Sequence, residues 1–131
     1  MPTIFTRIIN GEIPSYQVAE DDHFFAFLDI APLAKGHVLV VPKQEVDYIF
    51  DEDETLYQAH FLFARRVARA IEKAVPCERI GIAVVGLEVP HAHIHLIPLQ
   101  KNGSINFHDA KLRLEKEEMV ALAMAIKNHF S

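Results

Sequence analysis

Residues 89–99, VPHAHIHLIPL, alternate histidine with apolar side chains. The histidines are His91, His93 and His95, and the apolar residues that alternate with them are Ala92, Ile94 and Leu96. Successive side chains of a strand point to opposite faces of a sheet, so this pattern predicts a strand with two unlike faces. The apolar face should pack on a core and set the register, while the three imidazoles line a concave or solvent-facing surface.

The rest of the chain shows helices and strands that are unevenly interleaved. Apolar residues at helical spacing predict one long helix over 51–76, with Asp53 as its N-cap and Pro76 at its end. A C-terminal helix is expected over 114–129. The other expected elements are a short helical turn within 3–14 and strands over about 16–20, 23–29, 36–43 and 79–86, besides 89–99. This order favours an α+β fold with an antiparallel sheet of about five strands.

Length and composition limit the class of protein. The 131 residues are 50% hydrophobic, so we expect a single domain over 1–131 with a core of its own. A net charge of −5 argues against a nucleic-acid partner, because binding of nucleic acid needs a stripe of basic residues on the protein. Cys77 is the only cysteine, which excludes an internal disulfide and a Cys-rich zinc site. The sequence shows neither a secretory signal nor an apolar run of the ~20 residues that span a membrane, so we expect a cytoplasmic protein.

The residues alone leave three interpretations of the histidines open. In the first, they lie half-exposed on a sheet and have no function, which suits a lone histidine better than three in alternation. In the second, histidines two positions apart bind one zinc ion. In the third, imidazoles donate to phosphate oxygens and one attacks phosphorus, because its neutral nitrogen is nucleophilic near pH 7. Such a nucleophile needs its other nitrogen held by a carbonyl or a carboxylate.

The stretch HAHIHLIP resembles the signature of the histidine-triad (HIT) family, in which three histidines alternate with apolar residues. Residues 4–43 are also similar to the N-terminal half of histidine-triad nucleotide-binding proteins and bacterial histidine-triad hydrolases. A short helix, Glu-Ile-Pro, an acidic turn, Asp-Ile-x-Pro, Gly-His and apolar-Pro-Lys follow one another in the same order. The resemblance extends from about residue 4 to residue 99 and implies a HIT-like α+β fold.

The resemblance also implies a homodimer that acts on a nucleoside monophosphate joined to an amine or to a second phosphate. It implies that His93 is the nucleophile and that His91 orients it through its backbone carbonyl. His95 and His37 would support the α-phosphate, and Asp29 would accept hydrogen bonds from both ribose hydroxyls. The residues expected to wall the base are Phe5, Ile9, Ile13, Phe27 and Ile30. This scheme needs neither a cofactor nor a metal ion.

Some positions depart from the pattern of the family. Thr3 and Thr6 stand where many bacterial members carry a Cys-x-x-Cys that helps to bind a structural zinc, so we predict no zinc here. Leu87 and Glu88 replace a glutamine and a hydroxyl residue that contact the phosphates, and an asparagine common in the family is missing from 79–86. Because a carboxylate beside a phosphate is unfavourable, Glu88 either serves an amine or cationic leaving group or points away.

The function expected from these residues is hydrolysis at the α-phosphorus of nucleoside 5′-phosphoramidates or related conjugates, through a covalent nucleotidyl-histidine on His93. The alternatives are hydrolysis of dinucleoside polyphosphates, a non-catalytic nucleotide-binding module, and a metal-dependent enzyme with the three histidines as ligands. Without the resemblance, His37 is equally well a loop histidine, and the alternative for Asp29 is a capping or turn residue before Pro32.

Overall fold

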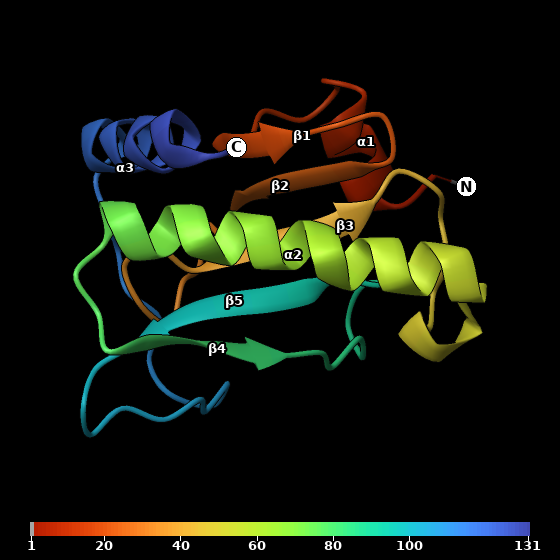
Figure 1. The fold of residues 1–131 in the computed structure, drawn as a ribbon. Helices are drawn as coiled ribbons and strands as arrows, with labels where there is room; N and C mark the ends of the chain where they lie inside the picture. The colour runs from red at the N-terminus through yellow and green to blue at the C-terminus, as the bar shows by residue number, and fades with distance from the viewer. Residues whose placement is uncertain (1) are drawn as a thin grey trace.

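The computed structural model describes residues 2–131, which form one five-stranded antiparallel sheet with helices on both faces (Figure 1). The strands are β1 (Gln17–Glu20), β2 (Phe24–Leu28), β3 (Val38–Pro42), β4 (Arg79–Ala83) and β5 (Ile94–Leu99). They lie in the order β1-β2-β3-β5-β4, so β1 and β4 form the two edges. The predicted α+β fold with an antiparallel sheet is therefore confirmed.

The helical segments begin and end at residues that suit those positions. They are α1 (Ile4–Ile9), the 3-10 turn η1 (Ile49–Asp51), α2 (Glu54–Ala74) and α3 (Lys116–His129). Asp53 caps α2 as predicted, since its carboxylate accepts a hydrogen bond from Leu56 N at 2.8 Å. Thr3 caps α1 in the same way, and its hydroxyl accepts from Thr6 N at 3.1 Å. α2 ends just before Pro76, which cannot continue a helix.

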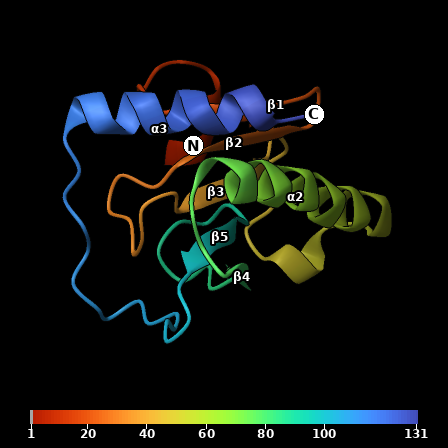
Figure 2. The same cartoon turned by 60° about the vertical axis from the view of Figure 1, so that its left-hand side comes forward.

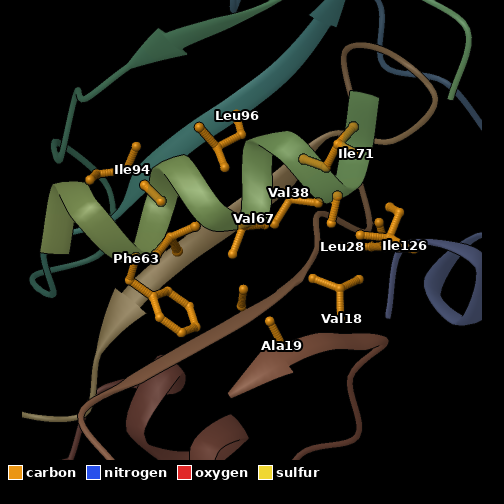
Figure 3. Close-up of a cluster of buried hydrophobic side chains, with 14 of the residues drawn as sticks. Val18, Ala19, Leu28, Val38, Phe63, Val67, Ile71, Ile94, Leu96 and Ile126 are labelled. Carbon is orange, nitrogen blue, oxygen red and sulfur yellow. The ribbon is translucent and has the colours of Figure 1, made fainter. Parts of the chain in front are cut away.

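The larger apolar cluster lies between the sheet and α2, which crosses one face of the strands (Figures 1 and 3). α3 packs beside α2 and against β1, and contributes to the same cluster. Figure 3 labels Val18, Ala19, Leu28, Val38, Phe63, Val67, Ile71, Ile94, Leu96 and Ile126. Full burial of each large aliphatic side chain contributes about 1.5–3 kcal/mol, so this face determines which side of each strand turns inward.

The opposite face of the sheet carries α1 and a smaller apolar cluster. The members of that cluster are Phe5, Phe25, Phe27, Leu39 and Val41. Since neighbouring residues of a strand alternate between faces, Leu39 lies in this cluster while Val38 and Val40 lie in the larger one. His95 lies directly across the ladder from Leu39 and therefore faces the same side. The α1 side of the sheet is thus the side of the histidine motif.

The strand predicted over 89–99 is shorter in the structure. β5 begins at Ile94, so His95 alone of the three motif histidines lies in a strand. Ahead of it, His91 N donates to Val89 O at 2.8 Å and closes a three-residue turn. The amide of the next residue donates to a loop carbonyl rather than to β3, so the backbone joins the ladder only at Ile94, within the motif.

Burial of the motif differs from the prediction in one respect. Ala92, Ile94 and Leu96 pack in the larger cluster, as predicted. The three histidines are not solvent-facing, because their exposed fractions are 0% for His91 and 7% for each of the other two. Aromatic side chains cover them on the α1 side of the sheet.

One further difference concerns the end of a strand. β4 ends at Ala83, before the predicted end at residue 86. The connection from β5 to α3, residues 100–115, is long and irregular and runs along one side of the molecule (Figure 2). Within residues 2–131, no helix is both long and apolar enough to cross a membrane.

Candidate active site

The ring of His93 is held at one of its two nitrogens. Nδ1 lies 2.7 Å from the carbonyl oxygen of His91. A carbonyl oxygen only accepts hydrogen bonds, so Nδ1 carries the proton, and in the neutral ring Nε2 carries the lone pair. Phe5 packs edge-on against this ring, with centroids 4.9 Å apart. His93 therefore has the orientation and tautomer that a nucleophilic imidazole requires.

A chain of hydrogen bonds determines the protons of His37 and His95. Leu33 N donates to His37 Nδ1 at 3.0 Å, so neutral His37 carries its proton on Nε2. That nitrogen lies 2.9 Å from His95 Nδ1 and donates to it. Neutral His95 then carries its own proton on Nε2, and this N–H donor takes no part in the hydrogen bonds from Leu33 to His37 and from His37 to His95. The ring centroids of His95 and His93 lie 5.0 Å apart, so the two imidazoles are direct neighbours.

Burial keeps these imidazoles neutral. It lowers the pKa of His37 from 6.5 to about 4 and the pKa of His95 to about 3. Burial also lowers the pKa of His93, and the carbonyl hydrogen bond and the negative charges of Asp29 and Glu88 oppose this shift. Because only the unprotonated ring has a lone pair at Nε2, the lowered pKa keeps His93 reactive at neutral pH.

Asp29 follows β2 and lies beside His37. Its Oδ1 accepts a hydrogen bond from Ala31 N at 2.9 Å, which is a turn contact. Its Oδ2 lies 3.7 Å from His37 Nε2. Burial raises the pKa of the Asp29 carboxyl group, opposed by the bond from Ala31. Oδ1 of Asp29 is thus engaged in the turn by its hydrogen bond, whereas Oδ2 is not part of the turn.

The residues expected to wall the base lie in different environments. Phe5 and Phe27 are buried together, with ring centroids 5.6 Å apart. Ile9 and Ile13 are half-buried, and Ile30 is 79% exposed. The two phenylalanines therefore belong to the core, while the three isoleucines have surface that a ligand can reach.

Glu88 is exposed on the segment that leads into the motif, next to Leu87, which is 88% exposed. Burial has the largest effect on the pKa of Asp29 and of His93, and the charge of Glu88 raises both values. The carboxylate thus lies within electrostatic reach of both residues.

The connection 100–115 brings two residues to the site that the sequence did not indicate. Phe107 packs edge-on against His95, with ring centroids 4.8 Å apart. Lys111 donates to two backbone carbonyls of the same connection, and its charge adds to burial in lowering the pKa of His37. A phenylalanine and a lysine in an irregular segment follow no period, so no pattern identifies them.

His91 is bonded at both ring nitrogens. Nε2 lies 2.7 Å from Pro42 O, and Nδ1 lies 2.7 Å from Thr3 Oγ1. Thr3 and Thr6 present hydroxyls that are engaged in hydrogen bonds, one of them to the carboxylate of Glu45. Zinc in structural sites takes thiolate, imidazole or carboxylate ligands, so these two hydroxyls do not fit a zinc ion. Glu45 is a further residue that the sequence did not indicate.

The histidines do not form one set of metal ligands. Both nitrogens of His91 are used by Pro42 and Thr3. Within residues 2–131, potential ligand atoms of Asp29, His37 and His95 lie within 4.8 Å of one another. The two imidazole nitrogens of that group are 2.9 Å apart, however, and share a proton that a cation would have to displace. The observed geometry is that of a hydrogen-bonded chain.

Comparison with known proteins identifies the family of this chain. The sequence model of the HIT domain family matches residues 10–102. A HIT-like protein of Borreliella burgdorferi is 37% identical over 131 residues, covering 94% of each chain. The adenosine 5′-monophosphoramidase of Saccharomyces cerevisiae is 36% identical over 110 residues, covering 78% of this chain and 66% of its own.

Solved structures give the same result. A HIT-like protein from Bartonella henselae has a TM-score of 0.85 at 30% identity, over 98% of this chain and 96% of that one. The family match, these relatives and the shared fold confirm the resemblance seen in the motif, and the chain belongs to the HIT domain family.

Proposed function

We propose that this protein hydrolyses nucleoside 5′-phosphoramidates or related nucleotide conjugates through a covalent nucleotidyl-histidine on His93. The arrangement of protons carries the proposal, because His93 keeps a lone pair on Nε2 while the adjacent His95 keeps an N–H donor. The activity of the yeast relative, an adenosine 5′-monophosphoramidase, supports the choice of substrate class.

The reaction has two steps. In the first, Nε2 of His93 attacks the α-phosphorus, a bond from phosphorus to the imidazole forms, and the bond from phosphorus to the leaving nitrogen breaks. The leaving nitrogen takes up one proton and departs as an amine. The carbonyl of His91 holds the Nδ1 proton of the positively charged ring. His95 Nε2–H donates to a phosphoryl oxygen and stabilises its charge.

In the second step, water attacks the phosphorus and the bond to Nε2 breaks. The electron pair of that bond returns to His93, and the attacking water loses one proton to the solvent, which balances the proton that the amine took from the solvent and carried away. The nucleoside monophosphate then leaves. Asp29 would hold the ribose, and Ile9, Ile13 and Ile30 would contact the base, during both steps.

Hydrolysis of dinucleoside polyphosphates is the second candidate. It shares the covalent step and differs in the leaving group, which is an anion. Lys111 favours this candidate, because its positive charge acts on His37 and Asp29. Glu88 favours an amine as the leaving group instead. Its negative charge acts on His93, and the same charge would repel an anionic leaving group at that point.

The test is to incubate the protein with adenosine 5′-phosphoramidate and a chelator and to measure release of the monophosphate. We expect release that the chelator does not affect, loss of release in His93→Ala, and normal release in His23→Ala, which removes an exposed imidazole. Mass spectrometry of the quenched reaction should find the nucleotidyl group on His93.

Turnover of dinucleoside polyphosphates alone would favour the second candidate, and loss of turnover with the chelator would favour a metal enzyme. Nucleotide binding without any turnover would favour a binding module.

We further propose that the protein is a homodimer and acts in the cytoplasm, where its nucleotide substrates are found. Among residues 2–131, β4 has no neighbour on its outer edge. Ile82 on this strand is 55% exposed, and Val85 just beyond it is 50% exposed. An apolar edge strand presents free backbone groups and is suited to pairing with a second copy of the chain.

A further inference from the structure

Three polar side chains outside the histidine motif form one hydrogen-bonded cluster against His91. Oε1 of Glu45 accepts from Thr6 Oγ1 at 2.6 Å and from Thr3 N at 2.7 Å. The hydroxyl of Thr3 lies 2.7 Å from His91 Nδ1. These contacts join residues 39 to 88 positions apart, so they bring the start of the chain, the end of β3 and the motif to one point.

The direction of each hydrogen bond follows from its partners. Pro42 O only accepts, so His91 carries a proton on Nε2, and burial lowers the pKa of this ring so that it is neutral. The lone pair on Nδ1 then accepts from the Thr3 hydroxyl. The oxygen of that hydroxyl accepts from Thr6 N, which leaves its proton for the imidazole. Hydrogen bonds, first of all the one from Thr6, lower the pKa of Glu45, so its carboxylate is charged and accepts both bonds.

The cluster reaches His93 through the backbone of His91. The ring of His91 cannot turn without breaking the bonds at both of its nitrogens, and its carbonyl is the group that holds His93 Nδ1. Phe5 lies between the two threonines in the sequence, and its ring packs against both His91 and His93, with centroids 5.7 Å and 4.9 Å away. Displacement of α1 would therefore release both imidazoles.

We propose that Thr3 and Glu45 are positioning residues for the nucleotidyl transfer, because they hold His91 so that its carbonyl keeps the proton of His93 on Nδ1 and the lone pair on Nε2. This inference rests on the proposed function, since it names residues that prepare the same nucleophile. A displacement of about 1 Å caused by a change away from the reacting atoms can slow an enzyme about 100-fold.

The kinetic test uses Thr3→Val, which keeps the shape of the side chain and removes its hydroxyl. We expect kcat to fall about 10- to 100-fold, while KM changes less than about twofold, since substrate contacts are unchanged. Thr3→Ser restores the hydroxyl and should restore kcat. Thr55→Val, at an exposed position of α2, is the matched control and should leave kcat unchanged. Normal kcat in Thr3→Val, or equal loss in Thr3→Ser, would overturn the inference.

Glu45→Ala repeats the test from the surface of the molecule, where the substitution leaves the core intact. It removes both bonds that hold the start of α1, so kcat should fall several-fold without a matching rise in KM. This variant decides the question if Thr3→Val does not fold. Unchanged kcat in Glu45→Ala would remove Glu45 from the proposal.

Nitrogen-15 NMR of the imidazoles tests the same inference without substrate. In the wild type we expect His91 to be protonated on Nε2 and His93 on Nδ1, and in Thr3→Val we expect His93 to become a mixture of tautomers. If the wild type shows these tautomers but never turns over, the proposed function fails, and the comparison with Thr3→Val then tests only whether Thr3 sets the tautomer of His93. If the wild type turns over and the tautomers are the same in Thr3→Val, the inference fails and the function stands.

Discussion

Two histidines of one motif acquire opposite chemical roles from their neighbours. His93 presents a lone pair at Nε2, because its Nδ1 proton is donated to a carbonyl. His95 presents a proton at Nε2, because its Nδ1 accepts from His37, which lies 58 positions away in the sequence. The side chains are chemically identical, so the partner of Nδ1 decides which ring can attack and which can donate.

The pH dependence of activity should report on His93. We expect kcat/KM to fall on acidification with a midpoint below pH 6.5, because burial lowers the pKa of His93 and only the unprotonated ring attacks. Glu88→Gln removes a negative charge that raises this pKa, so the midpoint should move further down, by a few tenths of a pH unit. Rates between about pH 4 and pH 8 give both midpoints.

Glu54→Gln, on the exposed first turn of α2, is the control for the loss of one carboxylate and should leave the midpoint in place. A wild-type midpoint at or above 6.5 contradicts the assignment of the acid limb to a buried His93. An upward shift in Glu88→Gln contradicts the proximity of the two residues.

The sequence made His91, His93 and His95 candidates because their alternation is a local pattern. Their tautomers could not be predicted, since each depends on a partner from another element. Thr3 was singled out only as a departure from the family, and its hydrogen bond to His91 spans 88 positions. Phe107 gave no signal, because a single aromatic residue in an irregular connection has no periodicity.

Among the elements, α2 is tied to the sheet by a buried polar pair as well as by apolar packing. His60 Nε2 donates to Val40 O of β3 at 2.9 Å. Its Nδ1 lies 2.9 Å from Oε2 of Glu52, and both side chains have no exposed surface. The side chain of His60 lies on the buried face of α2. Its partner lies just outside the observed helix, so the periodicity of the helix could not identify it.

Removal of one partner from this pair should destabilise the fold. We expect Glu52→Ala to lower the free energy of unfolding by about 3 kcal/mol, because His60 is left with an unpaired buried nitrogen. Glu54→Ala, on the exposed side of the same helix start, should cost less than about 1 kcal/mol. Urea denaturation of both variants measures the difference, and equal midpoints would show that the pair adds no stability.

Helices and central strands were better predicted than the motif strand itself. α2 and α3 begin and end within a few residues of the predicted limits. β5 begins at Ile94 instead of residue 89, because a three-residue turn at His91 and a bond from Ala92 N to Val46 O replace the strand ladder. Alternation predicts which residues share a face, but it does not report where the neighbouring strand stops pairing.

At the scale of the whole molecule, the two edges of the sheet are unlike. α3 packs against β1 at one edge, whereas β4 at the other edge carries the exposed Ile82 and is followed by the exposed Val84 and Val85. The order of strands could not be predicted from the sequence. β3 pairs with β5, although α2 and β4 lie between them in the chain, and no local pattern in the sequence reports such a distant pairing. The single domain over 1–131 and the homodimer both stay predictions.

The unlike edges make the homodimer testable. Light scattering after gel filtration should give twice the chain mass of 14.9 kDa for the wild type. Ile82→Lys places a charge on the exposed edge and should yield a monomer, because lysine on an edge strand opposes pairing with another chain. Met124→Lys, on an exposed position of α3, is the matched control and should remain a dimer. A monomeric wild type, or a dimeric Ile82→Lys, refutes pairing through β4.

The contact between Thr3 and His91 has a consequence for synthesis on the ribosome. Thr3 is synthesised 88 positions before the imidazole that its hydroxyl contacts. The six-residue α1 is too short to be a stable helix on its own, so we expect it to become stable only after His91 has been synthesised. A nascent chain stopped before the motif would contain most of the expected base pocket and no nucleophile. Activity should therefore be absent from unfinished chains and appear only after the motif has left the ribosome.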